Sequence, residues 1–250
     1  MPETGTPVEY SLLPEDRSFA SLLPAFLFPY IAYVGLGSLP ADLIGTDEAG
    51  LLRFGVVALL LTLFRKHYRF GAALTPRLIL IALAASLGSF ALWVASYRLS
   101  LALPWWHARL AGAESARPSS VYWVFRAVNS VLLVPVFEEL FCRAYLSELF
   151  RELPRDAGGF FGSLSRRMDA RPTALAAPPL SAASVIGSTL LFTLGHDVSA
   201  WIPAALYFAF TTWLYARTRS FALCVLVHAL TNLAIAGAVL QGAAMQFLWF

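Results

Sequence analysis

The chain has 250 residues, of which 58% are hydrophobic and 13% are charged, and its mean hydropathy is +0.67. A soluble domain carries about 25% charged residues, so much of the apolar surface of this chain must face lipid rather than water. The net charge of +3 is not a nucleic-acid signature, because the basic residues of membrane proteins gather in cytoplasmic loops. Composition therefore favours a protein of the lipid bilayer with no nucleic-acid partner.

The N-terminal segment and the cysteines carry further information. Residues 1–18 contain four acidic residues and one arginine, whereas a secretory signal begins with a positive region. We therefore predict a cytoplasmic N-terminal tail over residues 1–18, followed by a retained membrane anchor. Cys142 and Cys224 lie in apolar runs and lack the spacing of a disulfide framework or a structural zinc site.

Seven apolar stretches are long enough, or nearly so, to cross the hydrocarbon core of a bilayer, which takes about 20 residues of helix. The fourth is too long for one perpendicular span, so we expect it to tilt, to extend beyond the bilayer or to break near Pro135. We predict an all-α, polytopic transmembrane helical bundle of seven or eight helices. The stretches cover residues 19–39, 51–64, 78–101, 121–150, 182–195, 201–216 and 221–240.

Basic residues are concentrated in every second loop, at 65–77, 151–180 and 217–220, and the loop after the first stretch is acidic instead. By the positive-inside rule, this alternation predicts that the N-terminus and the three basic loops are cytoplasmic. The arginine-rich and alanine-rich composition is typical of a bacterial protein, so we place the chain in the bacterial inner membrane as a multi-pass protein. The long loop 151–180 has room for a short surface helix.

Two adjacent glutamates lie in the fourth stretch, where an ionisable side chain costs at least about 2.5–3.5 kcal/mol on insertion. On a helix, Glu139 and Arg143 share a face four residues apart, in the favourable order for an ion pair. Glu138 is rotated about 100° away and has no partner close in sequence, which suits a general base. The spacing predicts a structural pair beside a chemically active acid. The alternative is that both glutamates lie at a helix end among lipid headgroups.

Two histidines and an asparagine lie in or beside other apolar stretches. His196 follows the fifth stretch, and His228 and Asn232 lie one turn apart on one face of the seventh. Taken singly, these side chains could be interfacial groups or could link helices by hydrogen bonds. Brought together with Glu138 in a bundle interior, they would supply a base, an imidazole partner and two oxyanion donors. Amide hydrolysis needs such a set.

Three short motifs thus follow one another in the C-terminal half. They are EExxxR from Glu138 to Arg143, FxxxH from Phe192 to His196, and HxxxN from His228 to Asn232. The ordered set resembles the CAAX protease and bacteriocin-processing family (CPBP, or Abi family) of intramembrane endopeptidases, over about residues 120–240. The sequence before Glu138 is similar to an exosortase-associated bacterial branch of this family.

The resemblance implies an intramembrane protease that hydrolyses a peptide bond of a membrane-associated protein or peptide. It implies that Glu138 and His196 activate a water, that His228 and Asn232 stabilise the oxyanion, and that the acid–arginine pair is structural. The family often has Phe-Arg-Gly where this chain has Cys-Arg-Ala at 142–144, and bacteria largely lack prenylated CAAX proteins. A prenylated substrate is therefore not assumed.

The resemblance also divides the chain into N-terminal transmembrane helices over residues 19–119 and a catalytic membrane domain over residues 120–250. Metal dependence stays open, because Glu138, His196 and His228 could hold zinc with one open position. The HExxH arrangement is absent, and an asparagine beside a histidine suits an oxyanion better, so we expect glutamate-driven hydrolysis without a cofactor. The alternative functions are a non-catalytic scaffold or immunity-type binding protein and, less favoured, a proton-coupled transporter.

Overall fold

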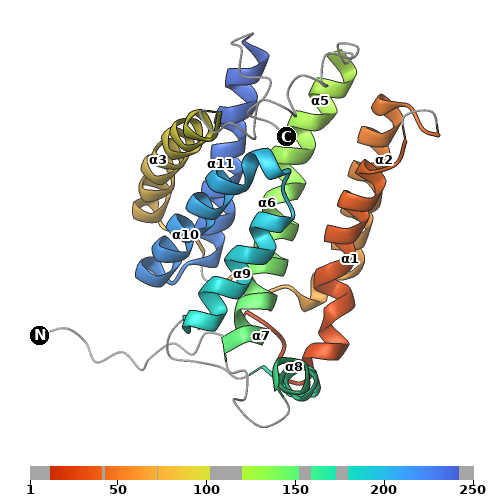
Figure 1. Cartoon of the computed structure of the whole chain (residues 1–250), viewed down its shortest axis with the longest axis vertical. Helices are drawn as coiled ribbons and strands as arrows, with labels where there is room; N and C mark the ends of the chain where they lie inside the picture. Colours follow the sequence, from red (N-terminus) through yellow and green to blue (C-terminus); the bar gives the residue numbers. More distant parts are fainter. Residues whose placement is uncertain are drawn as a thin grey trace, which may run out of the picture.

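The computed structural model describes residues 12–40, 43–71, 73–101, 120–151, 159–172 and 180–241, and the regular structure within them is entirely helical. Seven long helices form a bundle, and one short helix lies across an end of it (Figure 1). The helices are α1 (Phe19–Gly37), α2 (Thr46–Leu63), α3 (Pro76–Leu101), the continuous helix α5–α7 (Ser120–Arg151), α8 (Gly159–Asp169), α9 (Ala182–Leu194), α10 (Trp201–Thr218) and α11 (Phe221–Leu240).

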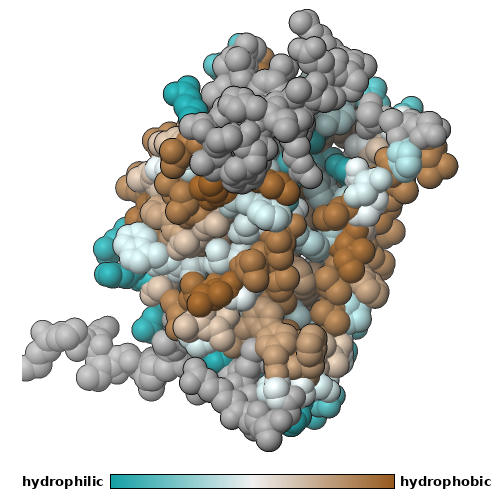
Figure 2. Space-filling model, in the orientation of Figure 1, coloured by the Kyte–Doolittle hydropathy of each residue, from teal (hydrophilic) through white to brown (hydrophobic). Residues whose placement is uncertain are grey.

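The prediction of an all-α membrane bundle with seven or eight helices is confirmed. Among the described helices, α1, α3, α5–α7 and α11 are long and apolar enough to cross a membrane, judged by length and composition. Figure 2 shows that apolar side chains cover much of the visible flank of the bundle. Large hydrophobic side chains such as Leu87 in α3 and Ile186 in α9 are exposed, which a lipid-facing surface allows.

Serine side chains start several of the helices. Ser18 Oγ accepts a hydrogen bond from the Ser21 amide at the start of α1, and Ser181 caps α9 in the same way. Such caps satisfy backbone N–H groups that the first turn of a helix leaves unpaired. Between α10 and α11, Arg219 adopts a left-handed backbone conformation with φ of 53°, which allows the chain to reverse within a short turn.

The fourth apolar stretch forms one 32-residue helix and does not break at Pro135. Inside it, two π-helical stretches, η2 (Asn129–Leu133) and η3 (Glu139–Leu146), flank the short segment α6 (Val134–Glu138). Proline has no N–H and clashes with the preceding turn, and a widened turn accommodates both effects. π-helical turns within α-helices occur frequently at functional sites. Here the second one begins beside Glu138.

The helices alternate in direction, so the loops predicted to be basic meet at one end of the bundle, the lower end in Figure 1. We call it the basic end, and the opposite end, where α2 begins and α9 leads into the turn η4 (Val198–Ala200), the far end. The described basic residues at the basic end are Arg17, Arg65, Lys66, Arg69, Arg77, Arg151, Arg166, Arg167, Arg171, Arg217 and Arg219.

The short helix α8 lies across the basic end, within the long loop where a surface helix was expected. Its Arg167 is buried, donates to the backbone carbonyl of Glu148 at 3.3 Å and lies 4.8 Å above the ring of Phe19. The carbonyl of Phe19 in turn accepts a hydrogen bond from the Tyr145 hydroxyl at 2.8 Å. These contacts fix the start of α1 against the end of the long helix, and they close the bundle at this end.

Candidate active site

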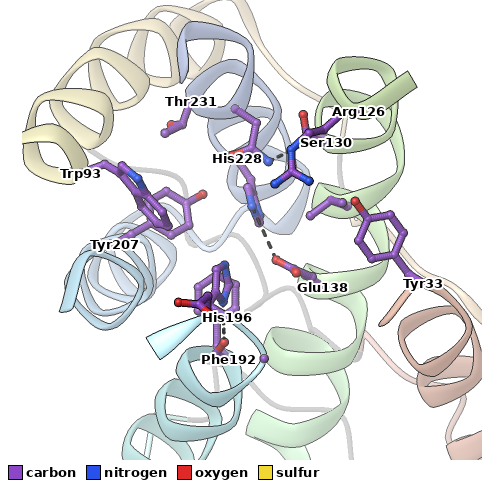
Figure 3. A pocket seen from close by; sticks show the side chains of 14 residues that line it. Tyr33, Trp93, Arg126, Ser130, Glu138, Phe192, His196, Tyr207, His228 and Thr231 are labelled. Carbon is purple, nitrogen blue, oxygen red and sulfur yellow. Dashed lines mark hydrogen bonds and ion pairs between the residues drawn. The ribbon is translucent and has the colours of Figure 1, made fainter. Parts of the chain in front are cut away.

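One interior cavity of about 180 Å³ collects the four side chains that the sequence singled out for chemistry. Glu138 is the last residue of α6, and His228 and Asn232 lie one turn apart on α11. His196 lies just after α9, in the turn that leads to η4. Figure 3 shows Glu138, His196 and His228 directed toward the same space, from α6, from the turn after α9 and from α11 respectively.

Glu138 is buried, with 8% of its surface exposed, and its Oε2 has no hydrogen-bond partner among the described residues. Nε2 of His228 lies 3.7 Å from this Oε2 (Figure 3). The other ring nitrogen, Nδ1, lies 3.4 Å from Oε1 of Glu139. The imidazole of His228 therefore lies between the two adjacent carboxylates, an arrangement that the sequence spacing did not predict.

Glu139 and Arg143 are in direct contact at the centre of the bundle. The Arg143 Nε donates to Glu139 Oε2, and its two terminal nitrogens each donate to a threonine of α10, Thr211 and Thr212, at 2.8 Å. The guanidinium also lies 4.5 Å from the centre of the Phe208 ring. A fully buried pair with this many hydrogen bonds is costly to break by removing one partner. The contact is the one that the EExxxR spacing suggested.

His196 has a defined ring orientation. Its Nδ1 lies 2.8 Å from the carbonyl oxygen of Phe192, and a carbonyl can only accept a hydrogen bond. The proton of a neutral His196 therefore resides on Nδ1, which leaves Nε2 as an acceptor. The backbone carbonyl of His196 accepts a hydrogen bond from Trp201 Nε1 at 3.1 Å, so both the ring and the turn are held in place.

Asn232 is anchored through the π-helical stretch η2. Its Nδ2 donates to the carbonyl of Ser130 at 2.7 Å. That carbonyl lacks its usual helical donor, because the amide of Val134 bonds to Asn129 instead and the next residue, Pro135, has no N–H. The asparagine therefore satisfies a backbone group that the proline and the π register leave open, and this contact joins α11 to the long helix beside Glu138.

The residues that line the cavity but were not among the motif residues include Tyr33, Trp93, Arg126 and Tyr207. Arg126 lies inside the fourth apolar stretch, so the criterion that drew attention to Glu138, an ionisable residue within a span, applies equally to it. The three aromatic residues gave no comparable signal, because aromatic side chains are common in apolar helices. Only their arrangement in space places them at the site.

A zinc site needs three protein ligands at about 2.0–2.2 Å from the ion. Across the residues that the structure describes, no three side chains of His, Cys, Asp or Glu are grouped closely enough to hold a metal ion. The alternative ligand set of Glu138, His196 and His228 is thus not assembled as a preformed metal site among these residues, and metal dependence stays a question for experiment.

The fold and the cavity define a class, a multi-pass helical membrane protein with ionisable side chains gathered at one interior site. Residues 120–234 match the family model of type II CAAX prenyl endopeptidases described as Rce1-like, and this segment contains all three motifs. This match confirms the resemblance to the CAAX protease family that was drawn from the motifs. No curated protein and no solved structure gives a significant match. The family supports endopeptidase activity on a peptide substrate in a membrane environment.

Proposed function

We propose that the chain is an intramembrane endopeptidase that hydrolyses a peptide bond of a membrane-associated protein or peptide with a water activated by Glu138 and His196. The observation that carries the proposal is the convergence of Glu138, His196, His228 and Asn232 on one cavity, where the buried Glu138 Oε2 has no hydrogen-bond partner among the described residues. Free hydrogen-bonding capacity at a buried acid is costly, so its presence favours a role in chemistry.

The reaction divides into two proton transfers. Glu138 takes a proton from the water while the water oxygen attacks the scissile carbonyl carbon, and Nε2 of His196 accepts the second water proton in a hydrogen bond. The new C–O bond places negative charge on the carbonyl oxygen, where His228 and Asn232 donate hydrogen bonds. Glu138 then delivers its proton to the amide nitrogen, the C–N bond breaks, and the products are an acid and an amine.

Purified protein in liposomes gives the direct test. The probes are fluorophore-labelled casein and a panel of quenched single-span model peptides, and the cleavage site is identified by mass spectrometry. We expect the wild type to cut at least one probe, and a triple variant with glutamine at Glu138, His196 and His228, purified in parallel, to cut none. Equal cleavage by both preparations would assign the activity to a contaminant, and a wild type that cuts nothing would contradict the proposal.

The proposed oxyanion site predicts a specific result for Asn232→Ala. The turnover number should fall about 10²–10³-fold, the usual effect of losing one oxyanion donor. The substrate KM should change little, because the oxyanion exists only near the transition state. Dialysis of the wild type against a strong chelator should leave activity intact, since the proposed donors are parts of the chain. Stoichiometric bound zinc, with activity that is lost on chelation and restored by zinc, would overturn the metal-free mechanism.

We also propose that the basic end of the bundle is cytoplasmic, together with the N-terminus, in the cell membrane of a bacterium. The charge difference between the two ends supports this orientation, because arginine and lysine favour the cytoplasmic side. The labelling experiment given below tests it.

A further inference from the structure

Tyr207 of α10 is a buried polar residue that the proposed reaction does not yet use. It is 2% exposed, and its hydroxyl has no hydrogen-bond partner among the described residues. It lines the catalytic cavity, and its ring centre lies 5.2 Å from that of His228. Figure 3 shows the hydroxyl pointing into the cavity on the side of His228.

Packing alone does not explain this hydroxyl. The Tyr207 ring packs against the rings of Trp93 and Phe192, with distances between ring centres of 6.3 Å and 6.1 Å. A phenylalanine ring would make the same contacts. The hydroxyl adds a desolvation cost of about 1–3 kcal/mol when it is left without a partner. A hydrogen-bond donor that its neighbours hold in a fixed position, pointing toward the reacting atoms, can stabilise the negative charge that develops in the transition state.

The proposed reaction also needs hydrogen-bond donors to the oxyanion, and few are available in the cavity. One N–H of Asn232 is already committed to the carbonyl of Ser130 at 2.7 Å, so only its second N–H is left to donate to the oxyanion. His228 lies between two carboxylates, with Nε2 3.7 Å from Glu138. We propose that the Tyr207 hydroxyl donates a hydrogen bond to the carbonyl oxygen of the scissile peptide as it becomes an oxyanion. This role rests on the proposed endopeptidase function.

The test compares two tyrosines whose buried hydroxyls both lack a hydrogen-bond partner among the described residues. Tyr207→Phe should lower the turnover number roughly 10²-fold with little change in KM, and its thermal unfolding midpoint should be equal to or above that of the wild type. The matched control is Tyr97→Phe in α3, because Tyr97 is buried, its hydroxyl has no partner in the part of the chain that the structure describes, and it does not line the cavity. The control should keep wild-type turnover.

The results for these variants distinguish a failure of the role proposed for Tyr207 from a failure of the proposed endopeptidase function. Wild-type turnover in Tyr207→Phe, alongside an inactive Glu138→Gln, would overturn the role of Tyr207 and leave the endopeptidase function standing. Equal losses in Tyr207→Phe and Tyr97→Phe would also overturn it, since a loss shared with the control is a packing effect. A Glu138→Gln variant as active as the wild type would contradict the proposed function itself.

Independently of Tyr207, the surroundings of the cavity differ between its two sides. On the side of the basic end, the Glu139–Arg143 pair is followed by a layer of fully buried side chains that includes Thr211, Phe208 and Tyr145. Protein interiors are packed at crystal-like density, so within the described part of the chain these buried side chains separate the cavity from the basic end.

The opposite side of the cavity is polar and partly exposed. Tyr33 lies in the part of α1 nearer the far end and Arg126 in the part of the long helix nearer the far end, and both side chains are partly exposed. Gly195 and Asp197, in the turn after α9, are exposed and also line the cavity. The cavity therefore has its accessible rim toward the far end of the bundle.

We infer that the cavity opens to the exoplasmic side of the membrane. The basic end carries the arginine-rich loops that favour the cytoplasm, and the accessible rim lies at the other end. If the proposed function holds, the substrates are proteins or peptides that present the scissile bond at the outer face of the membrane. Lipid-modified C-termini in the cytoplasm would then be out of reach.

Cysteine labelling tests the direction without any use of activity. Single cysteines replace Asp197 at the rim, and Arg69 and Phe161 at the basic end, all three of which are exposed. The native Cys142 and Cys224 are buried, so the parent chain gives the unlabelled baseline. A membrane-impermeant maleimide added to intact cells should label Asp197→Cys alone, and permeabilised cells should show all three labelled.

Labelling of the two basic-end cysteines in intact cells, with Asp197→Cys protected until permeabilisation, would overturn the orientation. Labelling of Arg69→Cys and Phe161→Cys from opposite sides of the membrane would contradict the placement of both loops at one end of the bundle. The substrate class is tested with two single-span model peptides that carry the same cleavage sequence on opposite sides of the membrane. Only the peptide with the outer sequence should be cut, and cleavage of the inner one alone would contradict the substrate assignment while leaving the endopeptidase function intact.

Discussion

Replacement of Glu139 by glutamine is expected to destabilise the protein by about 3–5 kcal/mol, the usual cost of removing one partner of a buried ion pair. The glutamine would leave the guanidinium of Arg143 charged, while the hydroxyls of Thr211 and Thr212, at 2.8 Å, can only partly compensate. The side chains of the pair are 0% and 1% exposed, so water cannot solvate the remaining charge. Thermal unfolding and denaturant titration of the detergent-solubilised protein measure the loss.

Two further variants make the result specific to the pair. Glu48→Gln removes an exposed acid from the first turn of α2 and should change the free energy of unfolding by less than about 1 kcal/mol. Combining Glu139→Gln with Arg143→Met removes both charges and should recover part of the lost stability, because no unpaired charge is left. An unfolding midpoint for Glu139→Gln at the wild-type value would show that the contact with Arg143 contributes nothing.

Features that are local in the sequence predicted the bounds of helix α11 and the contact between Glu139 and Arg143. The seventh apolar stretch was expected over residues 221–240, and α11 covers Phe221–Leu240. Long apolar runs bounded by charged loops have few structural solutions, because backbone polar groups in lipid must be satisfied within a helix. The contact between Glu139 and Arg143 was also accessible from sequence, since it depends only on a separation of four residues within one helix.

The contacts between helices could not be predicted in the same way. The position of His228 between two carboxylates depends on how α11 meets a π-helical stretch, and no spacing along the chain encodes that. The bond from Asn232 to Ser130 likewise follows from a carbonyl that Pro135 and the π register leave open. From the sequence, Pro135 suggests only a possible break in the helix. Its structural consequence is an acceptor for the asparagine of the third motif.

The two adjacent glutamates have different surroundings, and this predicts opposite phenotypes. Glu139 is held by Arg143, whereas Oε2 of Glu138 has no hydrogen-bond partner within the described part of the chain. Loss of the Glu138 carboxylate should therefore not weaken the fold. We expect Glu138→Gln to unfold at the wild-type temperature or slightly above it, because an uncharged amide of the same shape is easier to bury than a carboxylate.

The activity of Glu138→Gln should in contrast fall by roughly 10²–10⁴-fold, the usual contribution of a positioned general base. The control is Glu148→Gln, which removes another buried acid, one that bonds to Arg151 at 2.7 Å near the basic end and does not line the cavity. That variant should lose some stability and keep its turnover number at temperatures where it is folded. Turnover and unfolding are measured on the same liposome and detergent preparations. If Glu138→Gln proves unstable, its loss of turnover reflects unfolding and does not identify the base. If Glu148→Gln is folded and equally inactive, the loss of turnover follows from removing any buried acid, and Glu138 is again not identified as the base.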